Sequence, residues 1–221
     1  TITLKNTVYN NKLLIDFLDH STTLSPFHNG SSLEIIDEHF MSNRDLHIDQ
    51  RKFLVNALVS QYNSIGVETP SGVHQLEKKG VYTVTTGHQL CFMGGPQFFI
   101  HKIISTIKSC QLLKEKYSQN DFIPVFWMAS EDHDFQEISH TTIFGKKFSI
   151  EDTHDTIAVG RLKSSVFQSL HEEVKEFFKT DEKFKILEDL FEKAMSFDSW
   201  SKTTRFWVHH LFKDYGLVIL D

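Results

Sequence analysis

One stretch, residues 83–134, constrains the fold more than any other part of the chain. Its successive segments are T-V-T-T-G-H-Q-L (83–90), G-G-P (94–96), a helical stretch carrying Lys102, F-I-P-V-F-W-M-A (122–129) and S-E-D-H-D (130–134). β-Branched residues from Val81 predict a strand, and apolar residues that recur every three or four positions over 99–113 predict a helix. The apolar run 122–129 is typical of a central parallel strand buried on both faces. Together they predict a strand-helix-strand unit.

Both predicted strands end in polar residues. The first runs into Gly87, His88 and Gln89, and the second into the acidic cluster 130–134. In an open parallel sheet, ligands bind in the crevice at the carboxyl ends of the strands. We therefore expect the two clusters to form two walls of one site.

The remaining elements are predicted from periodicity and from turn residues. Helices are expected at 12–18, after Ser31 and Ser32, and at 44–64, with a break at T-P-S-G (69–72); a hairpin is expected over 141–150, helices over 165–178, 181–196 and 199–213, and a strand over 217–221. Pro124 fits best near the start of its strand, because proline lacks a ladder donor.

This pattern predicts four regions. They are a helical arm at 1–80 that packs on the core, a core at 81–160 with the candidate active site, a helical connecting segment at 161–215 and a return strand at 216–221. A core strand at the end of the sequence has no following helix to cover it. We therefore expect this sequence to be a fragment of a longer protein.

Composition excludes several classes of protein. The chain has 221 residues, 40% hydrophobic and 24% charged, with a net charge of −6, so it is an ordinary globular protein without the basic footprint of a nucleic-acid binder. Two cysteines are too few for a disulfide framework. No apolar run approaches the ~20 residues needed to span a membrane, and the start resembles no signal peptide. We expect a cytoplasmic location, with no nucleic-acid or membrane partner.

The glycine-rich turn has two interpretations. Thr86, Gly87 and Gln89 with Gly94 and Gly95 could expose amide N–H groups at a helix start, where an anion such as phosphate or carboxylate binds. The turn matches neither standard phosphate-binding glycine motif, and a tight strand-to-helix turn without a ligand remains an alternative. His88 and Gln89 favour a functional role for this turn, since a turn alone does not require these side chains.

The acidic cluster is the stronger signal. Glu131, Asp132, His133 and Asp134 would repel one another or lose hydration if buried without a use. They could provide a general base or hydrogen bonds to an amine or to hydroxyls, or they could form a solvated loop. We predict no metal site, because adjacent residues point in different directions and rarely bind one ion together.

Two other residues carry weaker signals. Lys102 could place its charge near a bound phosphate, or it could be an exposed surface lysine. Cys91 is expected to be a small packing residue, since a nucleophile would need a nearby base and His88 is the only local candidate.

The two central motifs resemble a known family. T-G-H-Q-L…G-G-P-Q-F-F-I-H-K-I-I-S-T-I (86–107) and V-F-W-M-A-S-E-D-H-D-F-Q-E-I (125–138) are similar to the BshC family, the cysteine-adding enzymes of bacillithiol biosynthesis, with weaker similarity at 24–28, 51–62 and 158–162. Gln97 and His101 stand where leucine and tyrosine are usual. Members are about twice this length or more, so the resemblance is to their N-terminal part.

The resemblance implies a fold and a reaction. The fold is α/β, with a Rossmann-like parallel sheet flanked by helices and an inserted helical connecting segment. The reaction is the ligation of L-cysteine to the amine of glucosaminyl-malate, which ATP or another nucleotide could drive, and the full-length protein would be a homodimer formed through a coiled coil beyond Asp221.

From the residues we assign roles within such a ligase. Asp132, His133, Asp134 and His88 are the catalytic candidates, while the glycine turn, Lys102 and Glu131 would bind substrate or anions. A non-catalytic nucleotide- or sugar-binding module and a metal-dependent hydrolase remain as alternative functions.

Overall fold

The structure is a computed structural model that describes residues 11–19, 21–27, 36–151 and 156–221. It divides into two compact units, Thr1–Asp45 and Leu46–Asp221. In the described part of the first unit, α1 (Lys12–Leu18) begins at Asn11, whose side chain accepts a hydrogen bond from Leu14 N, and α2 is Glu38–Ser42. The start predicted at Ser31 and Ser32 lies outside the described residues.

The second unit is built on a three-stranded parallel sheet. Its strands are β1 (Val81–His88), β2 (Asp121–Met128) and β5 (Val218–Leu220), in the order β1-β2-β5. β1 and β2 pair over their full length, from Val81 opposite Asp121 to His88 opposite Met128. The predicted α/β fold with a parallel, Rossmann-like sheet is confirmed.

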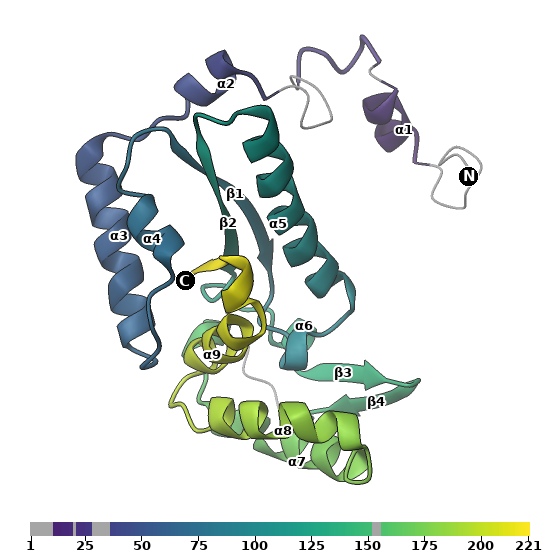
Figure 1. Cartoon of the computed structure of the whole chain (residues 1–221). Helices are drawn as coiled ribbons and strands as arrows, with labels where there is room; N and C mark the ends of the chain where they lie inside the picture. The colour runs from purple at the N-terminus through teal and green to yellow at the C-terminus, as the bar shows by residue number, and fades with distance from the viewer. Residues whose placement is uncertain (1–10, 20, 28–35, 152–155) are drawn as a thin grey trace. The chain divides into compact units, whose positions relative to one another are not determined.

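Helices cover both faces of this sheet. α5 (Phe98–Lys116) lies along β1 and β2 (Figure 1). The ring of Phe99 packs edge-on against that of Phe126. α3 (Ile48–Asn63) and α4 (Ser71–Gln75) lie on the other side in Figure 1, and Gly72 of α4 approaches Ile123 and Val218 so closely that a Cβ would be 3.2 and 3.4 Å from their methyl groups.

Pro124 lies inside β2 rather than near its start. The N–H groups of Asp121 and Ala129 donate to carbonyls of the β1 segment, so by alternation the nitrogen of residue 124 faces the β5 side. Pairing with β5 begins only at Val125, opposite Val218. The missing donor therefore falls just outside the paired segment.

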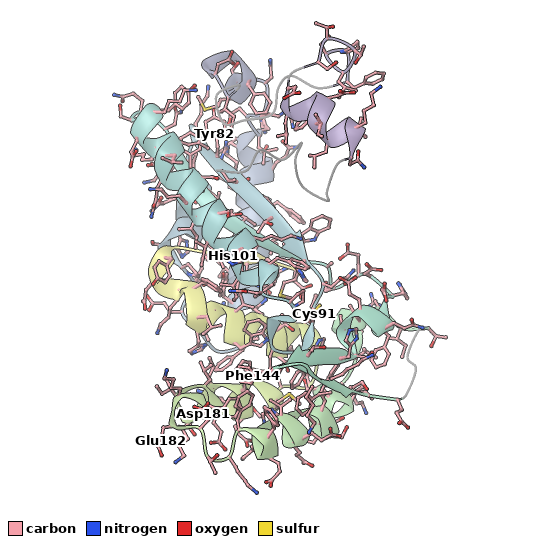
Figure 2. All side chains as sticks on the ribbon, turned by 90° about the vertical axis from the view of Figure 1, so that its right-hand side faces the viewer. Tyr82, Cys91, His101, Phe144, Asp181 and Glu182 are labelled. Atoms are coloured by element: carbon pink, nitrogen blue, oxygen red, sulfur yellow. The ribbon has the colours of Figure 1, made fainter. Side chains whose placement is uncertain are left out.

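A helical layer with a hairpin completes the unit. Its elements are η3 (Phe92–Gly94), α6 (Phe135–Ile138), β3 (His140–Ile143), β4 (Lys146–Ser149), η4 (Val159–Arg161), η5 (Ser164–Phe167), α7 (Gln168–Phe177), α8 (Glu182–Met195), α9 (Trp200–Phe212) and η6 (Lys213–Tyr215). Asp181, labelled in Figure 2, lies at the start of α8. Its side chain accepts hydrogen bonds from Lys183 N and Phe184 N and so caps the helix.

Aromatic rings join this layer to the sheet. Phe167 stacks on Trp200 with 3.7 Å between ring centroids, and Phe92 stacks parallel to the same indole at 6.1 Å. The indole N–H donates to Leu90 O at 2.6 Å, which ties α9 to the segment that follows β1. Most of the inward-facing phenylalanines therefore contribute to the packing of the core.

Two expectations from the sequence differ from the structure. The compact unit begins at Leu46, so α3 and α4 belong with the sheet and not with an arm that ends at residue 80. The segment 69–72, expected only as a break, contains the start of α4, because Pro70 precedes a helical turn without interrupting it. No helix among the described residues is long and apolar enough to cross a bilayer.

Candidate functional site

The two predicted clusters meet at the carboxyl edge of the sheet. β1 and β2 end opposite each other at His88 and Met128, and the chain then turns into Gln89 on one side and the loop 130–134 on the other. Gln89 Nε2 donates a hydrogen bond to Asp132 Oδ2. The carboxamide of one wall thus contacts the carboxylate of the other.

Asp132 is the best-connected acid of the loop. Besides Gln89, its carboxylate accepts the backbone N–H of His133 at 2.7 Å. The hydrogen bond from Gln89, followed by the one from His133 N, lowers the pKa of Asp132. A carboxylate held ionised in this way is suited to orienting a partner and poorly suited to accepting a proton.

Gln89 also has an unpaired group. Its Oε1 is buried and has no hydrogen-bond partner within the described part of the chain. Buried polar atoms are normally paired, because an unpaired acceptor costs roughly 1–3 kcal/mol. An N–H or O–H donor on a ligand would satisfy this oxygen.

His88 is buried beneath the glycine turn. Its ring lies 5.2 Å from that of Phe98 and 5.4 Å from that of Phe99, and its Nδ1 is 2.9 Å from Gln89 O. A carbonyl oxygen only accepts, so Nδ1 carries the proton and Nε2 keeps the lone pair in the neutral imidazole. The arrangement fixes the tautomer that a general base would need.

In the glycine turn, the amides of Gly94 and Gly95 are already hydrogen-bonded. The N–H groups of Gly94 and Gly95 donate to Cys91 O and Phe92 O, each at 3.0 Å, so neither is free to hold an anion. Both glycines have positive φ, and a Cβ would lie 2.9 Å from the Phe99 ring at Gly94 and 2.6 Å from Cys91 Cβ at Gly95. Glycine is therefore needed at these two positions because the chain makes a tight turn there.

Lys102 reaches the end of β1 from the second turn of α5. Its Nζ donates to Gly87 O at 3.2 Å and lies 5.5 Å from the centroid of the Phe98 ring. Gly87 itself lies under the Trp127 ring, and Thr86 is half-buried opposite Phe126 within the sheet. The exposed ammonium therefore lies beside the turn, as its place in the helix suggested.

The other acidic-loop residues separate into two groups. Asp134 accepts the backbone N–H of Glu137 at 3.0 Å and starts α6, which gives it a structural role and leaves its predicted catalytic role without geometric support. Glu131 and His133 are exposed and line a cavity of about 560 Å³.

This cavity opens at the carboxyl ends of β2 and β5. It is lined by Ser130, Glu131, His133, Thr156, Ile157, Ala158, Gly160, Arg161, Ser201 and Asp221. Only Glu131 and His133 of this set were predicted as site residues. Arg161 and Asp221 reach the cavity from segments far away in the sequence.

The loop A-V-G-R-L (158–162) is bonded directly to the acidic loop. Val159 N donates to Asp132 O at 2.7 Å, and Gly160 N donates to Ser130 O at 2.9 Å. A Cβ on Gly160 would lie 2.5 Å from Ser130 Cβ, so only glycine allows this approach. The sequence offered one hint, the weak family similarity at this loop.

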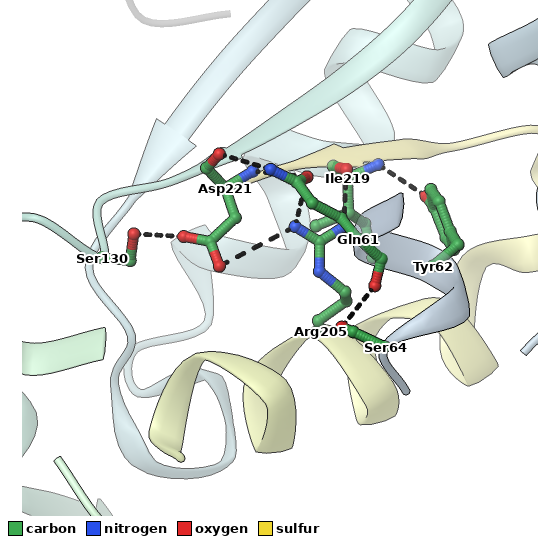
Figure 3. Close-up of polar contacts among 7 residues, drawn as sticks. All are labelled: Gln61, Tyr62, Ser64, Ser130, Arg205, Ile219 and Asp221. Atoms are coloured by element: carbon green, nitrogen blue, oxygen red, sulfur yellow. Dashed lines mark hydrogen bonds and ion pairs between the residues drawn. The ribbon is translucent and has the colours of Figure 1, made fainter. Parts of the chain in front are cut away.

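Asp221 connects the acidic loop to the core. Its carboxylate accepts a hydrogen bond from Ser130 Oγ and lies 3.9 Å from Arg205 Nη2 (Figure 3). Arg205 is only 2% exposed, and its Nη1 donates to Ile219 O at 2.8 Å. A buried guanidinium thus fixes the end of β5 beside the cavity.

Side chains close the outer edge of β5. Ile219 N donates to Tyr62 Oη at 2.8 Å, Asp221 N donates to Gln61 Oε1 at 3.3 Å, and Gln61 Nε2 donates to Asp221 O at 2.8 Å (Figure 3). Arg205 Nη2 also donates to Gln61 Oε1, at 2.8 Å. These bonds replace those of a neighbouring strand.

Cys91 is not poised as a nucleophile. The residue is 2% exposed, and its Sγ is 3.9 Å from His88 Nδ1, the nitrogen that already donates to Gln89 O. Burial, and then the charge of Glu137, raise the pKa of Cys91 to about 12. No three His, Cys, Asp or Glu side chains among the described residues are grouped so that they could hold a metal ion.

Comparison with known proteins gives a consistent result. The family profile described as "Bacillithiol biosynthesis BshC, N-terminal Rossmann-like domain" matches residues 1–221. A protein of Flavobacterium psychrophilum named "Putative cysteine ligase BshC" is 35% identical over 231 residues, which cover 100% of this chain and 42% of that protein. A protein of Christiangramia forsetii with the same name is 36% identical over 227 residues, covering 99% and 42%. The chain therefore spans less than half the length of these relatives.

Proposed function

Because the chain belongs to the BshC family, in which it matches the N-terminal Rossmann-like domain, we propose that the full-length protein is a carbon-nitrogen ligase that adds L-cysteine to the amine of glucosaminyl-malate. Relatives of this chain bear the name of a cysteine ligase in that family. Both substrates are small and polar, and each carries an amine and a carboxylate.

The contact between Gln89 and Asp132 is the observation that supports this proposal most directly. It joins the end of β1 to the loop after β2, at the sheet edge where open α/β folds bind ligands. A cavity of about 560 Å³ adjoins the same loop. Two polar substrates could therefore approach each other across residues 130–133.

We assign the proton-transfer role to one of two histidines, His88 or His133. His88 has its Nδ1–H bonded to Gln89 O, which leaves Nε2 as the acceptor, and His133 is exposed at the cavity. Asp132, held ionised by Gln89, would orient the incoming amine or the imidazolium that forms. Buried Gln89 Oε1 would accept a donor from a substrate.

Amide formation needs an activated carboxylate, and a nucleotide such as ATP is the proposed co-substrate. At this edge Lys102 provides a cationic side chain that could face its phosphates. The Gly94 and Gly95 amides are excluded from that role, because they donate within the turn.

The test is to incubate the full-length protein with L-cysteine, glucosaminyl-malate and each candidate nucleotide, and to look for bacillithiol by mass spectrometry. We expect product with at least one nucleotide, and loss of turnover without loss of folding in His88→Ala. Failure to form product under every condition, with a cooperative melting transition, would refute the ligase function. If His88→Ala weakened binding and output equally, a non-catalytic binding module would be favoured.

A further inference from the structure

The cavity beside the acidic loop is lined by two side chains of opposite charge, Arg161 and Glu131, that have no partner among the described residues. We propose that it binds a substrate carrying both a carboxylate and an amine, and that Arg161 is the anchor for the carboxylate. The identity of that substrate rests on the proposed function, whereas the charge pattern of the cavity does not.

Arg161 is held in place by its backbone and left free at its side chain. Its N–H donates to Ala158 O at 2.9 Å, and the two residues before it are bonded to the acidic loop. The guanidinium lines the cavity, is exposed, and has no hydrogen-bond or ion-pair partner among the described residues. A guanidinium presents a planar fork of donors that matches a carboxylate.

The first turn of α9 adds positive potential to the same wall. Ser201, in that turn, lines the cavity, and Ser199 at the helix start makes no side-chain capping bond. A 13-residue helix has partial positive charge at its N-terminus, which favours an anion nearby. This turn supports Arg161 but would not by itself define a site.

Among the described residues, two acids line the cavity with Arg161, and one of them is already paired. Asp221 accepts a hydrogen bond from Ser130 and lies 3.9 Å from buried Arg205, so its charge is already offset. Glu131 is exposed and has no partner in the described part of the chain. One free cation and one free anion are complementary to a ligand that bears both a carboxylate and an ammonium group.

The size of the cavity favours the larger of the two proposed substrates. A volume of about 560 Å³ lies within the roughly 300–1,000 Å³ typical of sites for drug-sized ligands. A single small amino acid would leave most of this space to water. An amino sugar linked to a dicarboxylate would fill more of it, so we assign the cavity to glucosaminyl-malate, with a malate carboxylate at Arg161 and the amine towards Glu131.

The experiment compares Arg161→Ala, Arg161→Lys and the control Lys163→Ala in the full-length protein. Lys163 is an exposed cation two residues further along that does not line the cavity. A charge-assisted pair contributes about 1.5–3 kcal/mol, which corresponds to about 10- to 150-fold in affinity. We expect Arg161→Ala to raise KM for glucosaminyl-malate by that factor, Arg161→Lys by less, and Lys163→Ala to have no effect. KM for L-cysteine and for the nucleotide should stay unchanged.

Calorimetry separates this proposal from the ligase proposal. The wild-type protein should bind glucosaminyl-malate more tightly than glucosamine, which lacks the carboxylates, and Arg161→Ala should remove the difference. If no ligation occurs but this carboxylate-dependent binding is seen, the cavity assignment stands and the ligase function falls. If ligation occurs and Arg161→Ala changes only the KM for the nucleotide or for L-cysteine, or changes nothing, the assignment is overturned.

Discussion

Replacing Gly160 by alanine should separate the two loops that form the candidate site. A Cβ at this position would lie 2.5 Å from Ser130 Cβ and 2.9 Å from Ser130 O. Carbon atoms normally pack at about 3.5–4.0 Å, so the loops must move apart by about 1 Å. The obstacle is backbone and Cβ, which cannot rotate away as the end of a long side chain could.

The expected loss of stability follows from the hydrogen bonds that this movement breaks. Val159 N to Asp132 O is 2.7 Å and Gly160 N to Ser130 O is 2.9 Å, and an added 1 Å takes both beyond hydrogen-bonding distance. Overpacking costs about 1–3 kcal/mol and each lost bond about 0.5–1.5 kcal/mol, while replacing glycine recovers about 0.4–1 kcal/mol from the unfolded chain. Because these contributions overlap, we expect a net loss of about 1–3 kcal/mol.

Urea denaturation of the full-length protein measures the change, with Gly87→Ala as the control. At Gly87 the three atoms nearest to a Cβ all belong to Trp127 and lie at 3.5 Å or more, which is ordinary contact. Gly160→Ala should lower the free energy of unfolding and raise KM for glucosaminyl-malate, because Arg161 moves with the loop, whereas Gly87→Ala should leave stability nearly unchanged. Equal stability of the two variants would show that the loops do not approach as described.

Three further changes test other parts of the structure. Arg205→Met should cost about 3–5 kcal/mol in a denaturant melt, because it leaves Ile219 O without its donor and Gln61 Oε1 with only the longer bond from Asp221 N; a loss below about 1 kcal/mol would contradict the buried network. Burial, and then the nearby positive charges of His210, Lys213 and Arg205, lower the pKa of His209 from 6.5 to about 4. As the pH falls, the unfolded chain therefore binds this proton before the folded protein does. The free energy of unfolding should decrease as the pH falls from about 6.5 to about 4. His209→Gln should flatten that part of the stability profile, and an unchanged slope would refute the assignment. Cys91→Ala should retain turnover, and the wild-type thiol should resist iodoacetamide at pH 8 until the protein unfolds; rapid labelling of the folded protein would contradict its raised pKa.

The sequence was sufficient for features that depend on local pattern. β-Branched residues from Val81 and the apolar run to Met128 identified the two parallel strands, because each pattern extends over a whole element. The same topology placed Gln89 and Asp132 at one edge of the sheet. Their direct contact follows from strands that start and end in register.

Features that depend on tertiary contacts could not be predicted. Gly94 and Gly95 looked like exposed donors, but whether an amide is free depends on which carbonyl it meets, here Cys91 O and Phe92 O. Arg161 and Asp221 gave little signal, since a lone arginine in a loop and an acid after a strand are common. Only the folded chain brings them into one cavity.

The closed edge of β5 determines where the sheet can grow. On that side the main-chain groups of Ile219 and Asp221 are already bonded to Gln61, Tyr62 and Arg205, so no strand can pair there without displacing a buried arginine. At the opposite edge, Thr83 and Thr85 of β1 are exposed. Any strand added to the described sheet must therefore lie next to β1, which would make β1 an interior strand and give the crevice at His88 a second side.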